Sequence, residues 1–454
     1  MADAGGSAGG TGGKDVDVVA VIDGAPLGRS IVLVVALCAG VSFLDGFDIL
    51  AISYVAPVIG AAWQLPKETF GPIFAAHYIG AAIGAVLFGW FADRYGRRMG
   101  VVLPTALFGV LALATVWAYD FRSLFVLRVL IGLGLGGALS NAIAMVAEYA
   151  PQRARATLVS LMYAAFPLGG VIGGPVSALL IARHGWQAVF VLGGVLPLLL
   201  SVALWLWLEE SIRFLVLSRA PAERIATRLR RIAPGFVAGA SDSYMLPQGR
   251  KLSLRPTREV FGPEFLRTSI LLCVAAFAAQ LVIVYVVTWM PLVLASIGMP
   301  VTSAILASVA FSVGGIFGAV GLARVIDRDK SYRGLVITFL VSAVAIAAIG
   351  YLARNWYALL AISFATGLLT VGANIVLSAY AATAYPTAIR STGLGWVVSL
   401  GRIGAIAGAL FGTALLAAGL GIESAYLIAA VPALIGGLAV ALVSARHQSK
   451  VVYA

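Results

Sequence analysis

Residues 70–118 read FGPIFAAHYIGAAIGAVLFGWFADRYGRRMGVVLPTALFGVLALATVWA, with apolar runs at 70–92 and 99–118 on either side of a short basic stretch. Each run is about 20 residues long, which is the length that an α-helix needs to cross a bilayer core of about 30 Å. The polar residues between the runs leave room only for a tight turn. This stretch therefore predicts two membrane-spanning helices that are joined on one side of the bilayer.

The rest of the chain has the same character. Of its 454 residues, 61% are hydrophobic and 11% are charged, whereas about a quarter of the residues in a soluble domain are charged. Apolar segments are predicted at 31–57, 70–92, 99–118, 122–148, 157–182, 187–208, 268–290, 302–326, 334–353, 356–383, 391–418 and 423–444. The expected fold class is therefore an all-α membrane protein with twelve transmembrane helices.

One long polar segment, rich in arginine, separates the first six apolar segments from the last six. We expect a flexible cytoplasmic leader at 1–30, an N-terminal six-helix bundle at 31–208, a cytoplasmic central loop at 209–267, a C-terminal six-helix bundle at 268–444 and a cytoplasmic tail at 445–454.

The lysine and arginine residues lie mostly on one side of the predicted spans. With both termini in the cytoplasm, 25 of the 31 fall on the cytoplasmic side and four on the other. This excess is the positive-inside signal that orients helices in a membrane. The net charge of +12 thus arises from loops beside a lipid bilayer and indicates no nucleic-acid partner. The sequence predicts a multi-pass protein of a bacterial-type inner membrane.

Several kinds of chemistry are excluded. The two cysteines, Cys38 and Cys273, lie in separate apolar segments and form neither a disulfide framework nor a metal-binding motif. The chain has no HExxH metal motif and no GxxxxGK[ST] nucleotide loop. We therefore expect no enzyme activity, no metal and no cofactor.

Two motifs recur in the second half of the chain. The pair Asp93–Arg94 recurs as Asp327–Arg328, and the pattern Pro-x-x-x-Arg-[Ala/Ser]-Thr at 151–157 recurs at 386–392, at nearly the same offset. Both copies follow equivalent apolar segments. They predict two parallel six-helix repeats, with a substrate site at their interface near the middle of the membrane.

The decapeptide Gly89–Arg98, GWFADRYGRR, resembles the GxxxDRxGRR loop of the major facilitator superfamily and lies where that superfamily has it, between the second and third helices. Within the first helix, Asp45–Asp48 resembles the DGFD or DGYD element of the aromatic acid:proton symporters. Trp289–Pro291 and Tyr385–Trp396 support the same resemblance, which covers nearly the whole chain. It implies the major facilitator fold and the import of a hydroxybenzoate-like aromatic carboxylate with protons.

Charged residues inside a membrane span are costly and are candidates for function. Asp45 and Asp48 lie three residues apart on one helix, so both side chains can face one cavity. Arg128 is expected at a height similar to that of Asp45, and Arg402 near the middle of the eleventh helix. We interpret the two aspartates as the proton-coupling pair, without assigning the proton to either one. A structural role, fixing the first helix to Arg128, is the alternative.

Two arginines suit a small organic anion, because a guanidinium group offers a planar fork to a carboxylate and stacks on aromatic rings. The predicted substrate-binding residues are Arg128, Arg402, Phe47, Tyr285, Trp289, Tyr380 and Trp396. Trp289 and Trp396 fit an interfacial aromatic belt equally well. His77 is either a proton carrier or a buried histidine with satisfied hydrogen bonds.

The charged loops are interpreted as a cytoplasmic gate, in which Arg94 or Arg97 pairs with Glu148. The predicted gate residues are Gly89, Asp93, Arg94, Gly96, Arg97, Glu148, Arg155, Asp327, Arg328 and Arg390.

Other functions remain open at this point. A symporter of a dicarboxylate or sugar acid would share these features, and Gly174-Pro175 faintly resembles an element of antiporters, which favours an exporter. A ligand sensor is the non-transport alternative. A monomer is expected, while the ring substituents and the proton stoichiometry stay undetermined.

Overall fold

The computed structural model describes residues 15–237, 239, 242–246, 256–329, 332–386 and 389–452. Within them, twelve helical segments are long and apolar enough to cross a membrane. They are α2 (Arg29–Trp63), α3 (Phe70–Tyr95), α4 (Arg97–Ala114), α5 (Phe121–Tyr149), α6 with α7 (Arg155–Tyr163 and Ala165–His184), α8 (Gln187–Trp207), α12 (Leu266–Ser296), α13 (Val301–Asp329), α14 (Tyr332–Leu352), α15 (Trp356–Ala384), α16 (Arg390–Ala417) and α17 (Ile422–Val452). The predicted fold class and the twelve spans are confirmed.

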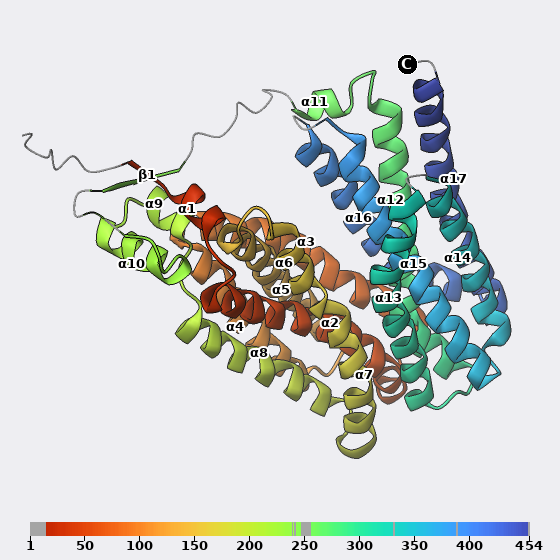
Figure 1. Cartoon of the computed structure of the whole chain (residues 1–454). Coiled ribbons are helices and arrows are strands. Elements are labelled where there is room, and N and C mark those ends of the chain that lie inside the picture. Colours follow the sequence, from red (N-terminus) through yellow and green to blue (C-terminus); the bar gives the residue numbers. More distant parts are fainter. Residues whose placement is uncertain are drawn as a thin grey trace, which may run out of the picture.

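The spans form two bundles, α2 to α8 and α12 to α17, which Figure 1 shows side by side. The same helix pairs pack in each bundle. In the first, α3 packs on α5, α2 on α7 and α4 on α8; in the second, α13 packs on α15, α12 on α16 and α14 on α17. Each pair in the second bundle is the counterpart of a pair in the first. The chain is therefore built from two parallel repeats.

Glycines at matching positions allow these pairs to approach closely. A Cβ atom added to Gly80 of α3 would lie 2.0 Å from the carbonyl oxygen of Val129 on α5, and one added to Gly314 of α13 would lie 1.9 Å from that of Phe364 on α15. Neither site has room for a side chain. Small residues serve this purpose where membrane helices are in backbone contact.

Regular structure extends into the segments expected to lack it. The strand β1 (Asp15–Asp17) pairs in parallel with β2 (Ser243–Met245), and the short helices are α1 (Val18–Gly24), α9 (Ile212–Leu217), α10 (Ala222–Ile232) and α11 (Pro256–Val260). Two short 3-10 turns, η1 (Lys67–Thr69) and η2 (Thr115–Trp117), complete the described elements.

Regular structure begins within the predicted leader, at Asp15. Val18 and Ile22 of α1 are buried in one apolar cluster with Ile225 and Leu229 of α10. The side chain of Asp17 accepts hydrogen bonds from the first N–H groups of α1, which stabilises the start of that helix. Helix α1 covers apolar residues of the central segment, a partner more than 200 residues away that the composition of the leader does not reveal.

Among the described residues, contacts between the two bundles include a cluster near one end of the molecule. We call this the closed end; it carries the connection between α2 and α3. There the hydroxyl of Thr413 on α16 donates to the carbonyl of Glu68 at 2.9 Å, and Phe74 of α3 lies edge-on to Trp289 of α12 with ring centroids 5.3 Å apart. At the opposite, open end, Figure 1 shows the ribbons of the bundles diverging. This end carries the junction between α3 and α4 at residues 93–98, which we call the loop 93–98.

Candidate functional site

A buried ion pair joins α2 to α5 inside the N-terminal bundle. The two terminal nitrogens of Arg128 donate to the two carboxylate oxygens of Asp48 at 3.0 and 3.1 Å. Both side chains are almost fully buried, and the guanidinium also lies 5.4 Å from the ring centroid of Phe190. A buried charge is tolerated only with such a partner, because its desolvation is costly. The two terminal nitrogens of Arg128 are thus paired within its own bundle, whereas its Nε has no hydrogen-bond partner among the described residues.

His77 of α3 lies between the two aspartates. Its Nδ1 is 3.6 Å from a carboxylate oxygen of Asp48, and its Nε2 is 3.7 Å from one of Asp45. These distances are slightly longer than hydrogen bonds, and Nδ1 has no hydrogen-bond partner among the described residues. The imidazole therefore faces one carboxylate with each ring nitrogen, and a small movement would bring either into contact.

The C-terminal bundle contributes Arg402 to the same region. This residue lies near the middle of α16, and its charge acts on both Asp45 of α2 and Tyr163 of α6. It is exposed although it belongs to a membrane span, and it forms no ion pair with a described carboxylate. Arg402 of one bundle is therefore within electrostatic range of Asp45 of the other.

The two aspartates differ in their surroundings. We expected Arg128 at the height of Asp45, but the structure pairs it with Asp48, one helical turn farther along α2. Asp45 instead faces His77 and the charge of Arg402. Among the described residues, the charge of Arg402 from the other bundle thus acts on Asp45.

Three of the five aromatic residues predicted to bind the substrate are packed against other residues of the bundles. The ring of Phe47 packs against Gly173 of α7 and Gly193 of α8 within the N-terminal bundle. Tyr285 is buried against Phe411 and Tyr426 in the C-terminal bundle. Trp289 donates from its indole nitrogen to the carbonyl of Ala409 at 2.9 Å and belongs to the closed end.

The other two aromatic predictions lie toward the open end of the C-terminal bundle. Trp396 is packed edge-on against Phe261, which follows α11. Tyr380 is half-buried on α15. Two tyrosines that we did not predict, Tyr78 and Tyr163, interact with the charge of Asp45 instead. Tyr78 follows His77 directly in the sequence, which was the one available signal.

The loop at 93–98 is held by a chain of ion pairs within the N-terminal bundle. Arg97 contacts Asp93 at 2.9 Å and Glu148 of α5 at 3.1 Å, and the hydroxyl of Ser211 donates to Glu148. Of the two expected partners of Glu148, the structure forms the pair with Arg97. Arg94 is exposed beside the ring of Tyr95. The loop is thereby tied to α5 and to the start of α9.

Gly96 is required in this loop on two counts. Its φ of 105° lies in the left-handed region, and an added Cβ would fall 2.2 Å from a carboxylate oxygen of Glu210. That carboxylate accepts the backbone N–H groups of Arg98 and Ser211 at 3.1 and 2.9 Å. Burial raises the pKa of Glu210, and these hydrogen bonds oppose the shift.

The remaining gate predictions have varied outcomes. Arg155 does not reach Glu148; it donates to the carbonyl of Ala150 and lies 3.9 Å from Asp23 of α1. Arg390 makes the matching contact in the other repeat, with the carbonyl of Tyr385. Gly89 has open space around it. The side chains of Asp327 and Arg328 lie outside the described residues.

Comparison with known proteins agrees with this architecture. The sequence matches the profile of the Major Facilitator Superfamily over residues 38–333 and again over residues 272–452. It is 37% identical to the 4-hydroxybenzoate transporter PcaK of Pseudomonas putida, across 95% of this chain and 97% of that one. It is 34% identical to the gallate transporter of the same species, across 94% of each.

A solved structure shows the same fold. The inward open conformation of the xylose transporter XylE from E. coli matches with a TM-score of 0.71 at 19% identity, across 90% of this chain and 95% of that one. Together with the sequence matches, this likeness assigns the chain to a family of membrane transporters and not to an enzyme family. The chain therefore belongs to the Major Facilitator Superfamily.

Proposed function

We propose that the protein imports an aromatic carboxylate of the hydroxybenzoate class, together with protons, across the inner membrane. The observation that carries the proposal is the buried cluster of Asp45, His77 and Asp48 in one bundle, facing an arginine of the other. The relatives named for 4-hydroxybenzoate and gallate support the substrate class. Both of those compounds are ring carboxylates.

Arg402 is the residue we assign to the substrate carboxylate. It is exposed between the bundles and has no described carboxylate partner, whereas Arg128 is already occupied by Asp48. A guanidinium group binds a carboxylate through two parallel hydrogen bonds. Tyr163, which is 42% exposed and close enough to interact with Arg402, is the candidate to contact the ring.

Competition for Arg402 supplies the coupling. The charge of Asp45 and the substrate carboxylate are both attracted to this guanidinium, so a proton on Asp45 frees Arg402 for the substrate. His77 lies next to Asp45 and Asp48 and is placed to move a proton: Nε2 takes one from Asp45 while Nδ1 releases one to Asp48.

The arrangement of the bundles fits one step of such a cycle. With the basic loops in the cytoplasm, the open end faces inward, and both described termini lie on that side. Phe74, Trp289 and the contact of Thr413 with Glu68 then seal the periplasmic end. We assign Asp93, Arg97 and Glu148 to the cytoplasmic gate.

The test is uptake into proteoliposomes that contain the purified chain, under an imposed pH gradient. Labelled 4-hydroxybenzoate and gallate are offered beside a dicarboxylate and a sugar acid, with and without a protonophore. Accumulation of the aromatic acids that collapses with the protonophore is expected. Uptake that survives the protonophore contradicts proton coupling, and transport of the other anions alone contradicts the substrate class.

A further inference from the structure

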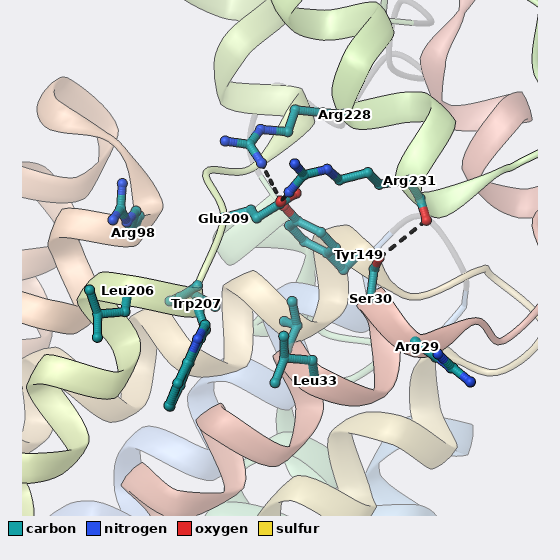
Figure 2. Close-up of a pocket in the computed structure, with 12 residues that line it drawn as sticks. Arg29, Ser30, Leu33, Arg98, Tyr149, Leu206, Trp207, Glu209, Arg228 and Arg231 are labelled. Carbon is teal, nitrogen blue, oxygen red and sulfur yellow. Dashed lines mark hydrogen bonds and ion pairs between the residues drawn. The ribbon is translucent and has the colours of Figure 1, made fainter.

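A basic pocket lies at the open end of the N-terminal bundle, apart from the site described above. It has a volume of about 400 Å³ and lies between the start of α2, the end of α8 and helix α10. Four arginines and one glutamate line it: Arg29, Arg98, Arg228, Arg231 and Glu209. Figure 2 shows these residues around the pocket. The lining carries a clear excess of positive charge.

The single carboxylate is shared. Arg228 and Arg231 both form ion pairs with Glu209, and Figure 2 shows the two guanidinium groups converging on it. Arg98 donates to the carbonyl of Trp205, and Arg29 forms no ion pair within the described part of the chain. Within the lining, four cations face one carboxylate, and Glu210 beside it also interacts with Arg98. A net positive charge remains for an anionic ligand.

The other wall of the pocket is apolar and exposed. Leu33 of α2 and Leu206 and Trp207 of α8 are 42%, 64% and 58% exposed. Trp207 is the last residue of its membrane span, and tryptophan at such a position marks the boundary between hydrocarbon and headgroups. The pocket therefore presents cations beside a surface that faces acyl chains, and a ligand that matches it has an anionic head and an apolar tail.

We propose that this pocket binds the headgroup of an anionic phospholipid, with its phosphate against the arginines and its acyl chains along Leu33, Leu206 and Trp207. Guanidinium groups bind phosphate oxygens bidentately, and basic pockets beside membrane helices bind anionic headgroups. A bound lipid connects α2, α8 and α10. It also lies next to the loop 93–98, because Arg98 is part of that loop and lines the pocket. A soluble phosphate shares the chemistry of the head but leaves the apolar wall uncovered.

The test uses the purified full chain in detergent, titrated with phosphatidylglycerol and, separately, with phosphatidylcholine of the same acyl chains, and read by native mass spectrometry. The wild type is expected to prefer phosphatidylglycerol. Arg29→Gln should lower its apparent affinity about fivefold and Arg29→Gln with Arg231→Gln about thirtyfold. The matched control, Arg224→Gln with Arg230→Gln, removes the same charge from exposed positions of α10 outside the pocket and should have little effect.

A second measurement locates the lipid. Phosphatidylglycerol with brominated chains should quench the fluorescence of the wild type more strongly than the brominated phosphatidylcholine does, and Trp207→Phe should remove that difference. Equal affinity for the two lipids, or an unchanged affinity in the double arginine variant, overturns the proposal. Displacement of phosphatidylglycerol by an excess of inorganic phosphate also overturns it, since the site then takes a soluble anion.

Discussion

The two bundles share the same helix packing and differ in the side chains that occupy equivalent positions. Gly132 of α5 lies against the carbonyl of His77, and Gly367 of α15 lies against that of Phe311, with added Cβ atoms at 2.2 and 1.9 Å. His77 and Phe311 are therefore structural counterparts. By the same register, Arg128, four residues before Gly132, corresponds to Ser363.

The first helix of each bundle gives the same result. A Cβ atom added to Gly169 would lie 2.0 Å from the carbonyl oxygen of Phe43, and one added to Gly404 would lie 2.2 Å from that of Phe277. Asp45 and Asp48 follow Phe43 at the distances at which Ala279 and Val282 follow Phe277. The charged cluster of the N-terminal bundle thus has an apolar and hydroxyl counterpart in the C-terminal bundle. Helix packing is thus repeated in the two bundles, while the cluster of Asp45, Asp48, His77 and Arg128 is not.

The largest effect is expected when the buried pair is broken. Arg128→Ser, which installs the residue of the other bundle, leaves Asp48 buried and unpaired and should destabilise the fold by about 3–5 kcal/mol. Arg128→Ser with Asp48→Val should recover most of that loss, because both charges are gone. Unfolding in detergent measures both, and Ser363→Ala is the matched control. A fully stable single variant would contradict the pairing.

Substrate affinity tests the single charge that the second bundle contributes. Arg402→Ala should weaken binding of the aromatic acid about a hundredfold, since the carboxylate loses its charged partner. Arg402→Lys should recover little, because an ammonium group lacks the planar fork. Calorimetric titration of the purified variants measures the affinity. Arg354→Ala, at an exposed position, is the control; near wild-type affinity in Arg402→Lys would show that the fork is unnecessary.

Coupling should depend on the first bundle alone. Asp45→Asn is expected to abolish accumulation driven by a pH gradient and to preserve exchange of labelled for unlabelled substrate, which requires no net proton movement. Asp48→Asn should differ, because it also releases Arg128. His77→Phe, which copies Phe311, should retain packing and lose coupling. If all three variants still accumulate substrate, the proton follows another route.

The smallest effect concerns the loops. Asp93→Asn removes one of the two carboxylates that contact Arg97, and Glu148 remains in place. Transport should therefore slow severalfold while substrate binding is unchanged. Asp327→Asn, in the degenerate copy, should be milder. Equal defects in the two loops would indicate symmetric gates, and loss of binding in Asp93→Asn would assign that residue to the substrate site.

Much of this molecule is predictable from sequence, for physical reasons. Spans follow from apolar length, and Asp45, Asp48, Arg128 and Arg402 stand out because charge is rare in a bilayer. The partner of Arg128 is not predictable, since it depends on how α2 is rotated against α5.

The aromatic residues show the limit most clearly. Phe47 and Tyr285 lie on helices that are apolar on every side, so the sequence pattern does not reveal which face meets the other bundle. The pairing of β1 with β2 is equally hidden, because Asp15 and Ser243 are 228 residues apart and each strand has only 3 residues.

Because Trp289 contacts Phe74 across the two bundles, its fluorescence can report on the closed end. The indole of Trp289 donates a hydrogen bond to Ala409 of its own bundle, and its aromatic neighbour, Phe74, belongs to the other bundle. If the bundles separate at this end, Trp289 keeps the hydrogen bond and loses the contact with Phe74. Water that enters there stabilises the excited state of the indole and shifts its emission to longer wavelengths. With the other eight tryptophans of the chain replaced by phenylalanine, the emission maximum of Trp289 reports when the closed end opens.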